Sequence, residues 1–226
     1  MPRYSQPRKP WQRVVFVLAI VALILARLTK TTPGDFGRDT GKPSATERTR
    51  SSTERGTAMP EPSARWETLT GCTLVEDKGN DGDSFILRHN GNDYHFRLYY
   101  ADCPEKYRHQ YNGDRIAEQG RYFGGLSETQ VTASGLDARE FTLSLLRKGP
   151  VTAVTRWEHV YTPERRYAFV SAGGQDLAEA LIRQGLARMH TKGANQPGAV
   201  SGSQEKERLR ALEREAKSRR LGAWDN

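Results

Sequence analysis

A four-residue segment, His89-Asn90-Gly91-Asn92, constrains the fold more than any other part of the sequence. Asn-Gly is the dipeptide best suited to the positive φ angles of a tight hairpin turn. The residues on both sides alternate between apolar and polar, which is the pattern of strands with one buried face. We therefore predict an antiparallel hairpin made of strands over residues 85–89 and 94–100.

Alternation along the second of these strands assigns its side chains to two faces, because successive side chains of a strand point to opposite sides. One face carries Tyr94, Phe96, Leu98 and Tyr100, and the other carries His95, Arg97 and Tyr99. The first set is expected to enter the core. Arg97 is therefore expected to leave the core side and to face either solvent or a functional site.

Further periodic stretches predict the remaining elements. Strands are expected over residues 72–76, 151–157 and 167–172, and helices over 115–123, 128–147, 177–184 and within 204–221. Ser127 and Gln130 fit a capping box at the start of the second helix. Five strands with interspersed helices predict an α+β fold, mainly β, in which a five-stranded OB-like barrel carries about three to four packed helices.

The N-terminal segment, residues 1–30, is predicted to be a signal peptide or a membrane anchor. Its apolar run over residues 14–26 follows several basic residues and is shorter than the roughly 20 residues of a spanning helix. The Ala-Arg-Leu-Thr that follows is a poor cleavage site, which slightly favours an uncleaved anchor. Basic residues before the run would keep the N-terminus inside, so we expect an extracytoplasmic domain, membrane-anchored or secreted.

Composition places one domain after this segment. Residues 31–66 are rich in Ser, Thr, Pro, Gly and charge, which predicts a flexible polar linker and leaves residues 67–226 as the domain. The net charge of +8 favours a polyanionic partner. Cys72 and Cys103 are the only cysteines. They cannot form a disulfide framework, and either one bridge or two buried thiols is possible.

Two acidic clusters flank the predicted hairpin strands. Asp81-Gly82-Asp83-Ser84 precedes the first strand, and Asp102-Cys103-Pro104-Glu105 follows the second. They should meet at the same edge of the sheet, where uncompensated carboxylates would repel, so a cation bound by hard oxygen ligands is indicated. Taken alone, Asp-Gly-Asp would favour a simple turn, because Asp and Gly are common turn residues.

Four motifs, in this order, resemble the staphylococcal nuclease (thermonuclease) family. They are DGDS at residues 81–84, FRLYYADCPE at 96–105, ERRYAFV at 164–170 and DLAEALIRQGLA at 176–187. The resemblance covers residues 71–224, and order, spacing and several adjacent residues agree. It implies an SNase-like OB-fold domain and a metal-dependent endonuclease that hydrolyses phosphodiester bonds of DNA and/or RNA, which the N-terminal segment would place outside the cytoplasm.

The resemblance also implies a metal site and a carboxylate that acts on water. Asp83, Asp102 and the backbone carbonyl of Cys103 correspond to the ligands of one Ca²⁺ ion, and other hard divalent cations are possible. Glu105 corresponds to the carboxylate that positions the attacking water.

Two arginines correspond to the family's phosphate clamp. They are Arg97 and Arg165, with Arg166 as the alternative to Arg165. Planar guanidinium groups bind phosphate bidentately, and together with a cation they neutralise the charge that grows on the phosphate oxygens.

The sequence departs from the family pattern in two places. The family's base-stacking tyrosines fall on Thr191 and Gly193 and its pocket tyrosine on Pro163, so nucleotide affinity or preference should differ. Candidates to replace them are Tyr161, His190 and Tyr107. In addition, residues 106–138 form a longer connection than usual, which either shapes the substrate groove or packs on the barrel.

An enzyme is favoured over two other classes. A non-catalytic OB-fold module that binds nucleic acid or protein would be expected to have lost clamp or metal residues, and all of them are present. A structural envelope protein would leave the acidic and arginine set unexplained. The expected partners are DNA and/or RNA, and the membrane if the N-terminal segment is uncleaved; the chain is expected to be a monomer.

Overall fold

The computed structural model describes residues 59–161, 164–198 and 200–225. The predicted signal peptide or anchor and the predicted linker up to residue 58 lie outside this part of the chain. Within the described ranges, no helix combines the length and the apolar character needed to cross a bilayer. Met59 and Trp66 pack against the core, so packed residues already precede the first strand.

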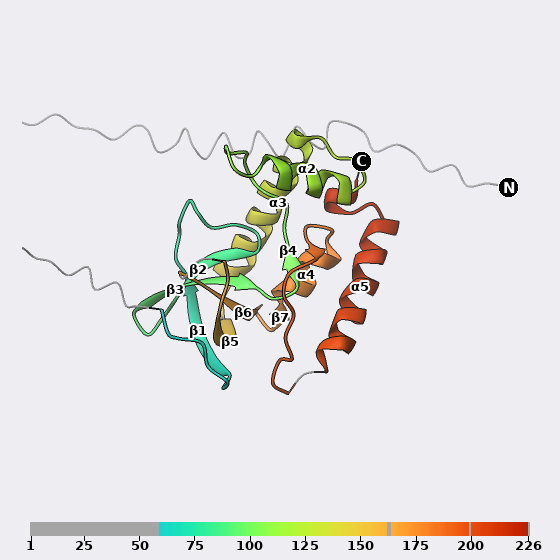
Figure 1. Ribbon diagram of the computed structural model, residues 1–226. Helices are drawn as coiled ribbons and strands as arrows, with labels where there is room; N and C mark the ends of the chain where they lie inside the picture. The colour runs from blue at the N-terminus through green and yellow to red at the C-terminus, as the bar shows by residue number, and fades with distance from the viewer. Residues whose placement is uncertain (1–58, 162–163, 199, 226) are drawn as a thin grey trace, which may run out of the picture. The chain divides into compact units, whose positions relative to one another are not determined.

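A closed barrel of five strands forms the centre of the described structure (Figure 1). Its strands are β1 (Glu67–Leu74), β2 (Ser84–His89), β3 (Asn92–Leu98), β5 (Val151–His159) and β6 (Arg165–Ala172). Neighbours in the order β3-β2-β1-β5-β6 are antiparallel, and a parallel pairing of β3 with β6 closes the barrel. The predicted α+β, mainly β, OB-like barrel is confirmed.

Short strands and helices surround the barrel. β7 (Gln175–Asp176) pairs with β6, and β4 (Ala101–Asp102) pairs with β8 (Arg188–Met189) in a separate small sheet. The helices in the described residues are α2 (Gly113–Tyr122), α3 (Glu128–Arg147), α4 (Leu177–Arg183) and α5 (Gly202–Ser218), followed by the 3₁₀ turn η1 (Gly222–Trp224). Helix α2 lies at one end of the barrel, and α4 lies between the barrel and α5 (Figure 1).

The predicted hairpin is confirmed in its turn and its register. Asn90 and Gly91 have φ angles of 50° and 78°, as a two-residue turn with two left-handed positions requires. The register places Ser84 opposite Arg97. The first acidic cluster therefore lies beside Arg97 at the open end of the hairpin.

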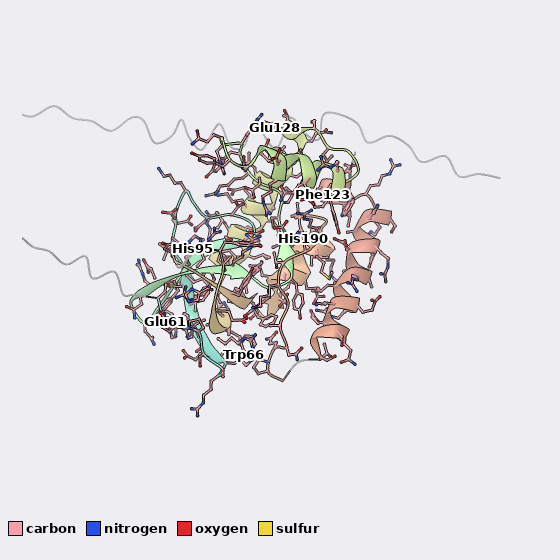
Figure 2. The ribbon with its side chains drawn as sticks, viewed as in Figure 1. Glu61, Trp66, His95, Phe123, Glu128 and His190 are labelled. Carbon is pink, nitrogen blue, oxygen red and sulfur yellow. The ribbon has the colours of Figure 1, made fainter. Side chains whose placement is uncertain are left out.

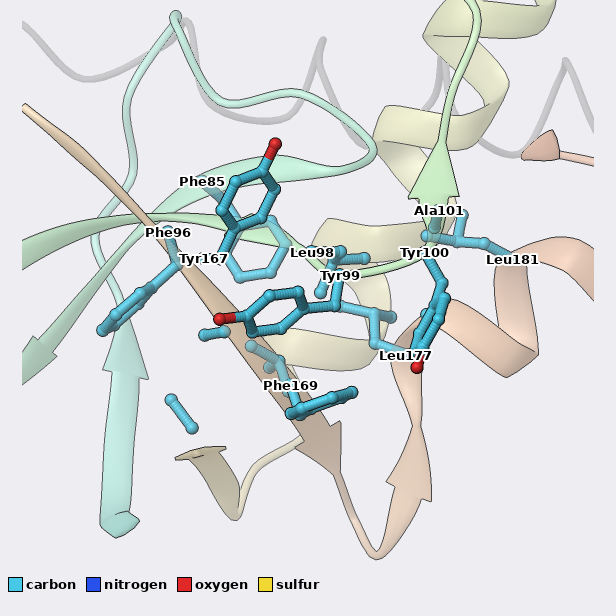
Figure 3. Close-up of a cluster of buried hydrophobic side chains, with 14 of the residues drawn as sticks. Phe85, Phe96, Leu98, Tyr99, Tyr100, Ala101, Tyr167, Phe169, Leu177 and Leu181 are labelled. Carbon is cyan, nitrogen blue, oxygen red and sulfur yellow. The ribbon is translucent and has the colours of Figure 1, made fainter. Parts of the chain in front are cut away.

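The second hairpin strand ends earlier than predicted. β3 stops at Leu98, and Tyr100 has a positive φ of 65°. Tyr99 is consequently buried, and its ring stacks on Tyr167 and Phe169 at centroid distances of 5.0 and 4.7 Å (Figure 3). The predicted turn of Tyr99 away from the core was wrong, because alternation holds only while the strand continues.

Helix starts follow local capping chemistry. Ser127 and Gln130 form the predicted capping box at the start of α3. Asp176 accepts a hydrogen bond from the Glu179 N–H at 2.8 Å at the start of α4. A second capping box, Ser201 with Gln204, starts α5 two residues before the predicted helix. These side chains satisfy backbone donors that a helix leaves free in its first turn.

The two cysteines are free, buried thiols. The Cys72 thiol donates to the Leu69 carbonyl at 3.3 Å. Burial raises the pKa of the Cys103 thiol well above its ordinary value. Of the two arrangements that the sequence left open, the structure has two small buried residues.

Gly193 is predicted to tolerate no side chain, because a β-carbon there would overlap the Tyr100 ring. Gly193→Ala should lower the free energy of unfolding by about 1–3 kcal/mol, measured by urea unfolding. Gly113→Ala is the matched control, since its β-carbon would meet only the flexible end of Arg108, at 3.4 Å. Equal stability of the two variants would contradict the prediction.

Candidate active site

A cavity of about 750 Å³ opens at the end of the barrel where β2 begins and β3 ends. Its walls include all six predicted site residues, which are Asp83, Arg97, Asp102, Cys103, Glu105 and Arg165. His95 and His190, which are labelled in Figure 2, also line it. The folded chain therefore gathers residues from positions 83 to 190 around one space.

The barrel pairings bring these residues together. Asp83 directly precedes β2, and its carbonyl accepts from the Leu98 N–H at 2.9 Å. The parallel pairing of β3 with β6 sets His95 beside Arg165. This pairing joins segments that are 70 residues apart (165 − 95). Closure of the barrel is therefore what brings Arg165 to the same cavity as Arg97.

Arg97 connects the two acidic clusters. Its guanidinium donates to Asp83 Oδ1 at 2.9 Å and to Asp102 Oδ1 at 2.6 Å. The Cys103 N–H donates to Asp83 Oδ2 at 2.7 Å. The acidic clusters thus meet at one edge of the sheet, as predicted, and Arg97 compensates their repulsion.

Asp102 is the carboxylate of the cavity with the most arginine partners. Besides Arg97, Oδ1 accepts from Arg115 Nη2 at 2.6 Å, and Oδ2 accepts from Arg188 Nε at 2.8 Å. The Arg188 side chain is fully buried and also binds Glu118 of α2 at 2.5 Å. Burial opposes ionisation, but Arg115, Arg97 and Arg188 hold the pKa of Asp102 below its ordinary value.

In the first acidic cluster, the negative charges of Asp81 and Asp83 are less neutralised by arginines than that of Asp102. Burial raises the pKa of Asp83 above its ordinary value, against the opposing effect of Arg97. Burial and the neighbouring Asp83 raise the pKa of Asp81 to about 7. Negative charge is therefore costly at this end of the cavity, which is where a cation would relieve it.

Helix α2 and its N-cap residue Asn112, within the long connection over residues 106–138, supply site residues that the sequence analysis missed. Arg115 Nε donates to Glu105 Oε1 at 2.5 Å, and Asn112 Nδ2 donates to Glu105 Oε2 at 3.4 Å. Gln119 donates to the Cys103 carbonyl at 3.0 Å and accepts from the Glu105 N–H at 3.0 Å. The connection shapes the cavity as well as packing on the barrel.

A sequence signal for these residues existed. Asn112, Arg115 and Gln119 are spaced by three and four positions, which places them on one face of a helix. What the spacing could not indicate was that this face meets Glu105.

The residues predicted to supply oxygen ligands to a cation all line this cavity. The oxygen atoms belong to Asp83, Asp102 and the Cys103 carbonyl, and they are the hard ligands that Ca²⁺ prefers. Arg97 and Arg115 bind the same carboxylates. Within the described residues, no group of three or more His, Cys, Asp or Glu side chains is arranged to hold a metal ion. The oxygen donors suit a hard cation in their chemistry. The guanidinium groups of Arg97 and Arg115 compete with a cation for these carboxylates.

Arg165 and Arg166 have different surroundings. Arg165 lines the cavity, and its Nη1 lies 3.5 Å from Ser84 Oγ. Arg166 is buried, and its Nε donates to the Pro60 carbonyl at 3.0 Å. The geometry therefore favours Arg165 over Arg166 as the second arginine of the cavity.

The positions of the family's tyrosines offer no ring to a base. Thr191 Oγ1 donates to the Leu98 carbonyl at 3.3 Å, and Gly193 has no room for a side chain against Tyr100. Pro163 lies outside the described residues. Tyr161 lines the cavity and is 92% exposed.

Comparison with known proteins gives one family. A family model described as staphylococcal nuclease homologue matches residues 95–226. No curated protein matches the chain. The matched range contains Arg97, Asp102, Glu105 and Arg165, whereas Asp83 precedes it.

A stability prediction follows from His95. Burial and the Arg165 guanidinium lower the pKa of His95 from 6.5 to about 4. Between these two pH values the unfolded chain binds a proton that the folded domain does not, so stability is full above pH 6.5 and is lost as pH falls towards 4. The loss at His95 should be on the order of 1–3 kcal/mol.

His95→Gln should flatten this acid-side decline in urea unfolding measured across the same pH range. His89→Gln, at the other end of the hairpin, is the matched control and should keep the wild-type slope. An unchanged slope in the His95 variant would exclude this residue as its source.

Proposed function

The chain belongs to the staphylococcal nuclease homologue family, and from this premise we propose that it is a metal-dependent endonuclease that hydrolyses phosphodiester bonds of DNA and/or RNA. The observation that carries the proposal is the convergence of Arg97, Asp102, Glu105 and Arg165 on one cavity. Two arginines beside a carboxylate meet the needs of phosphodiester hydrolysis, which are charge neutralisation and an oriented water.

In this proposal Arg97 and Arg165 bind the non-bridging oxygens of the scissile phosphate. Arg97 is held by two carboxylates, at 2.9 and 2.6 Å, so its donors are oriented before the substrate arrives. Donors that need no reorganisation stabilise the developing charge most effectively.

Glu105 accepts a proton from the water that attacks phosphorus, the P–O bond to the leaving strand breaks, and the leaving oxygen takes up a proton from water. Its carboxylate is oriented by Arg115 at 2.5 Å and Asn112 at 3.4 Å. Fixing the base relative to the phosphate clamp contributes through proximity and orientation.

We assign one Ca²⁺ ion, or another hard divalent cation, to Asp83, Asp102 and the Cys103 carbonyl. When bound there, it would supply Lewis-acid stabilisation of the phosphate charge. These three residues all line the cavity, and their oxygen atoms are the hard ligands that such cations prefer.

The proposal includes a location outside the cytoplasm. The apolar run over residues 14–26 with basic residues before it supports an extracytoplasmic enzyme, anchored or secreted. We also propose a monomer, and a membrane contact only through an uncleaved N-terminal segment.

One observation favours a second candidate, a non-catalytic OB-fold module that binds nucleic acid or protein. Arg115 engages both Asp102 and Glu105, so an arginine already neutralises two carboxylates that a nuclease would use.

Release of acid-soluble nucleotides from DNA and RNA by the purified full chain, with calcium, magnesium or chelator, distinguishes the nuclease from the binding module. Metal-dependent release supports the nuclease, and tight binding without release under every condition supports the module.

Glu105→Gln should lower turnover by about 100-fold or more, because an amide cannot accept the water's proton. The steady-state rate of nucleotide release measures this. Glu140→Gln makes the same change at an exposed side chain of α3 and should leave the rate unaltered. Equal rates for the two variants would refute the role of Glu105.

Arg115→Met should have two separate effects, because it removes the guanidinium that binds Asp102 and Glu105. Turnover should fall about tenfold or more as Glu105 loses its fixed orientation. The metal concentration that gives half-maximal activity should also fall, since a competing positive charge is gone. A metal titration of wild type and variant measures both effects, and a variant identical to wild type in both would contradict this role for Arg115.

A further inference from the structure

The six residues that follow Glu105 alternate basic or polar side chains with rings. They read Lys-Tyr-Arg-His-Gln-Tyr over residues 106–111. Tyr107 is 56% exposed and Tyr111 is 84% exposed. Large rings left in water beside a cavity indicate a surface that a ligand covers.

The rings form a row that we call the aromatic ledge, consisting of Tyr107, His109 and Tyr111. The His109 ring centroid lies 6.2 Å from that of Tyr107 and 6.2 Å from that of Tyr111. His109 also lines the cavity. The ledge therefore continues the wall of the proposed active site outwards.

Hydrogen bonds hold the ledge in its shape. Asn112 accepts from the His109 N–H at 2.8 Å and donates to the Tyr107 carbonyl at 3.0 Å. The Tyr111 N–H donates to His109 Nδ1 at 3.2 Å. Because these hydrogen bonds already order the backbone, binding of a ligand to the rings carries little entropic cost of ordering it.

Ion pairs and cation contacts fix the two sides of the ledge. Arg108 pairs with Glu128 at the start of α3, at 2.9 Å. The Lys106 ammonium lies 5.6 Å from the Tyr107 ring centroid and donates to the Lys78 carbonyl at 3.1 Å. The ledge thus presents rings on a fixed backbone, which suits a ligand that carries flat groups.

We infer that the aromatic ledge binds the unpaired bases of single-stranded DNA or RNA next to the cavity. Asn112 links the two, since it orders the ledge and also donates to Glu105 at 3.4 Å. A strand whose phosphate lies at Arg97 and Arg165 would place neighbouring nucleotides on the rings. Stacking needs free base faces, which a duplex keeps inside its own stack. The inference rests on the proposed function for the identity of the strand.

The test is binding of the full chain to a fluorescein-labelled single strand, to a duplex of the same sequence and to an abasic strand of the same length. Fluorescence anisotropy in chelator measures affinity without turnover. The variants are Tyr107→Leu with Tyr111→Leu, which lacks both rings, and the matched Tyr107→Phe with Tyr111→Phe, which keeps them.

Loss of both rings should weaken single-strand binding by about tenfold or more, whereas the phenylalanine pair should bind within about twofold of wild type. Duplex and abasic binding should be the same in all three proteins. The thermal unfolding midpoint checks that each variant is folded.

Unchanged single-strand affinity in the leucine pair, or an equal loss on the duplex or the abasic strand, would overturn the inference. Failure of the proposed function appears separately in the nucleotide-release assay. If the chain binds single strands through the rings but releases no nucleotides, the inference about the aromatic ledge stands and the proposed nuclease activity is refuted.

Discussion

The site depends on one buried carboxylate. Asp102 is 1% exposed and accepts hydrogen bonds from three arginines that come from β3, α2 and β8. A buried charge is tolerated only when it is paired and its lone pairs are satisfied. The barrel, the inserted helix and the chain after α4 therefore have to meet at this point for Asp102 to remain ionised. The geometry of the cavity follows from that meeting.

Helix α2 makes the largest difference between this domain and the simple expectation from its motifs. Through Arg115, Gln119 and its N-cap residue Asn112, it contacts Glu105 and the Cys103 carbonyl. Three functions proposed for this edge, which are water orientation, cation binding and base stacking, thus share one short stretch of chain. A change in α2 would alter them together, because the hydrogen bonds of Asn112 connect the ledge to Glu105.

Packing in the core explains why one of the family's stacking tyrosines has no counterpart at position 193. Tyr100 leaves the strand with a positive φ and packs its ring where a side chain at position 193 would lie. Its hydroxyl donates to the Ala194 carbonyl at 2.6 Å. Packing between the end of β3 and the segment after β8 thus uses space that a stacking ring would need. Among the described residues, three strongly exposed tyrosines lie elsewhere, at Tyr107, Tyr111 and Tyr161, and Tyr161 lines the cavity.

The elements governed by short-range chemistry could be predicted from the sequence. The Asn90-Gly91 turn, the Ser127 capping box and the Asp176 cap follow from local backbone preferences. The motifs identified the family and selected residues that all line one cavity. Tertiary structure alone decided that Arg165 rather than Arg166 faces the cavity, that Tyr99 enters the core, and that Arg115 and Arg188 reach Asp102. Each of these outcomes depends on contacts between segments distant in the chain or on where a strand stops, which periodicity within one segment does not contain.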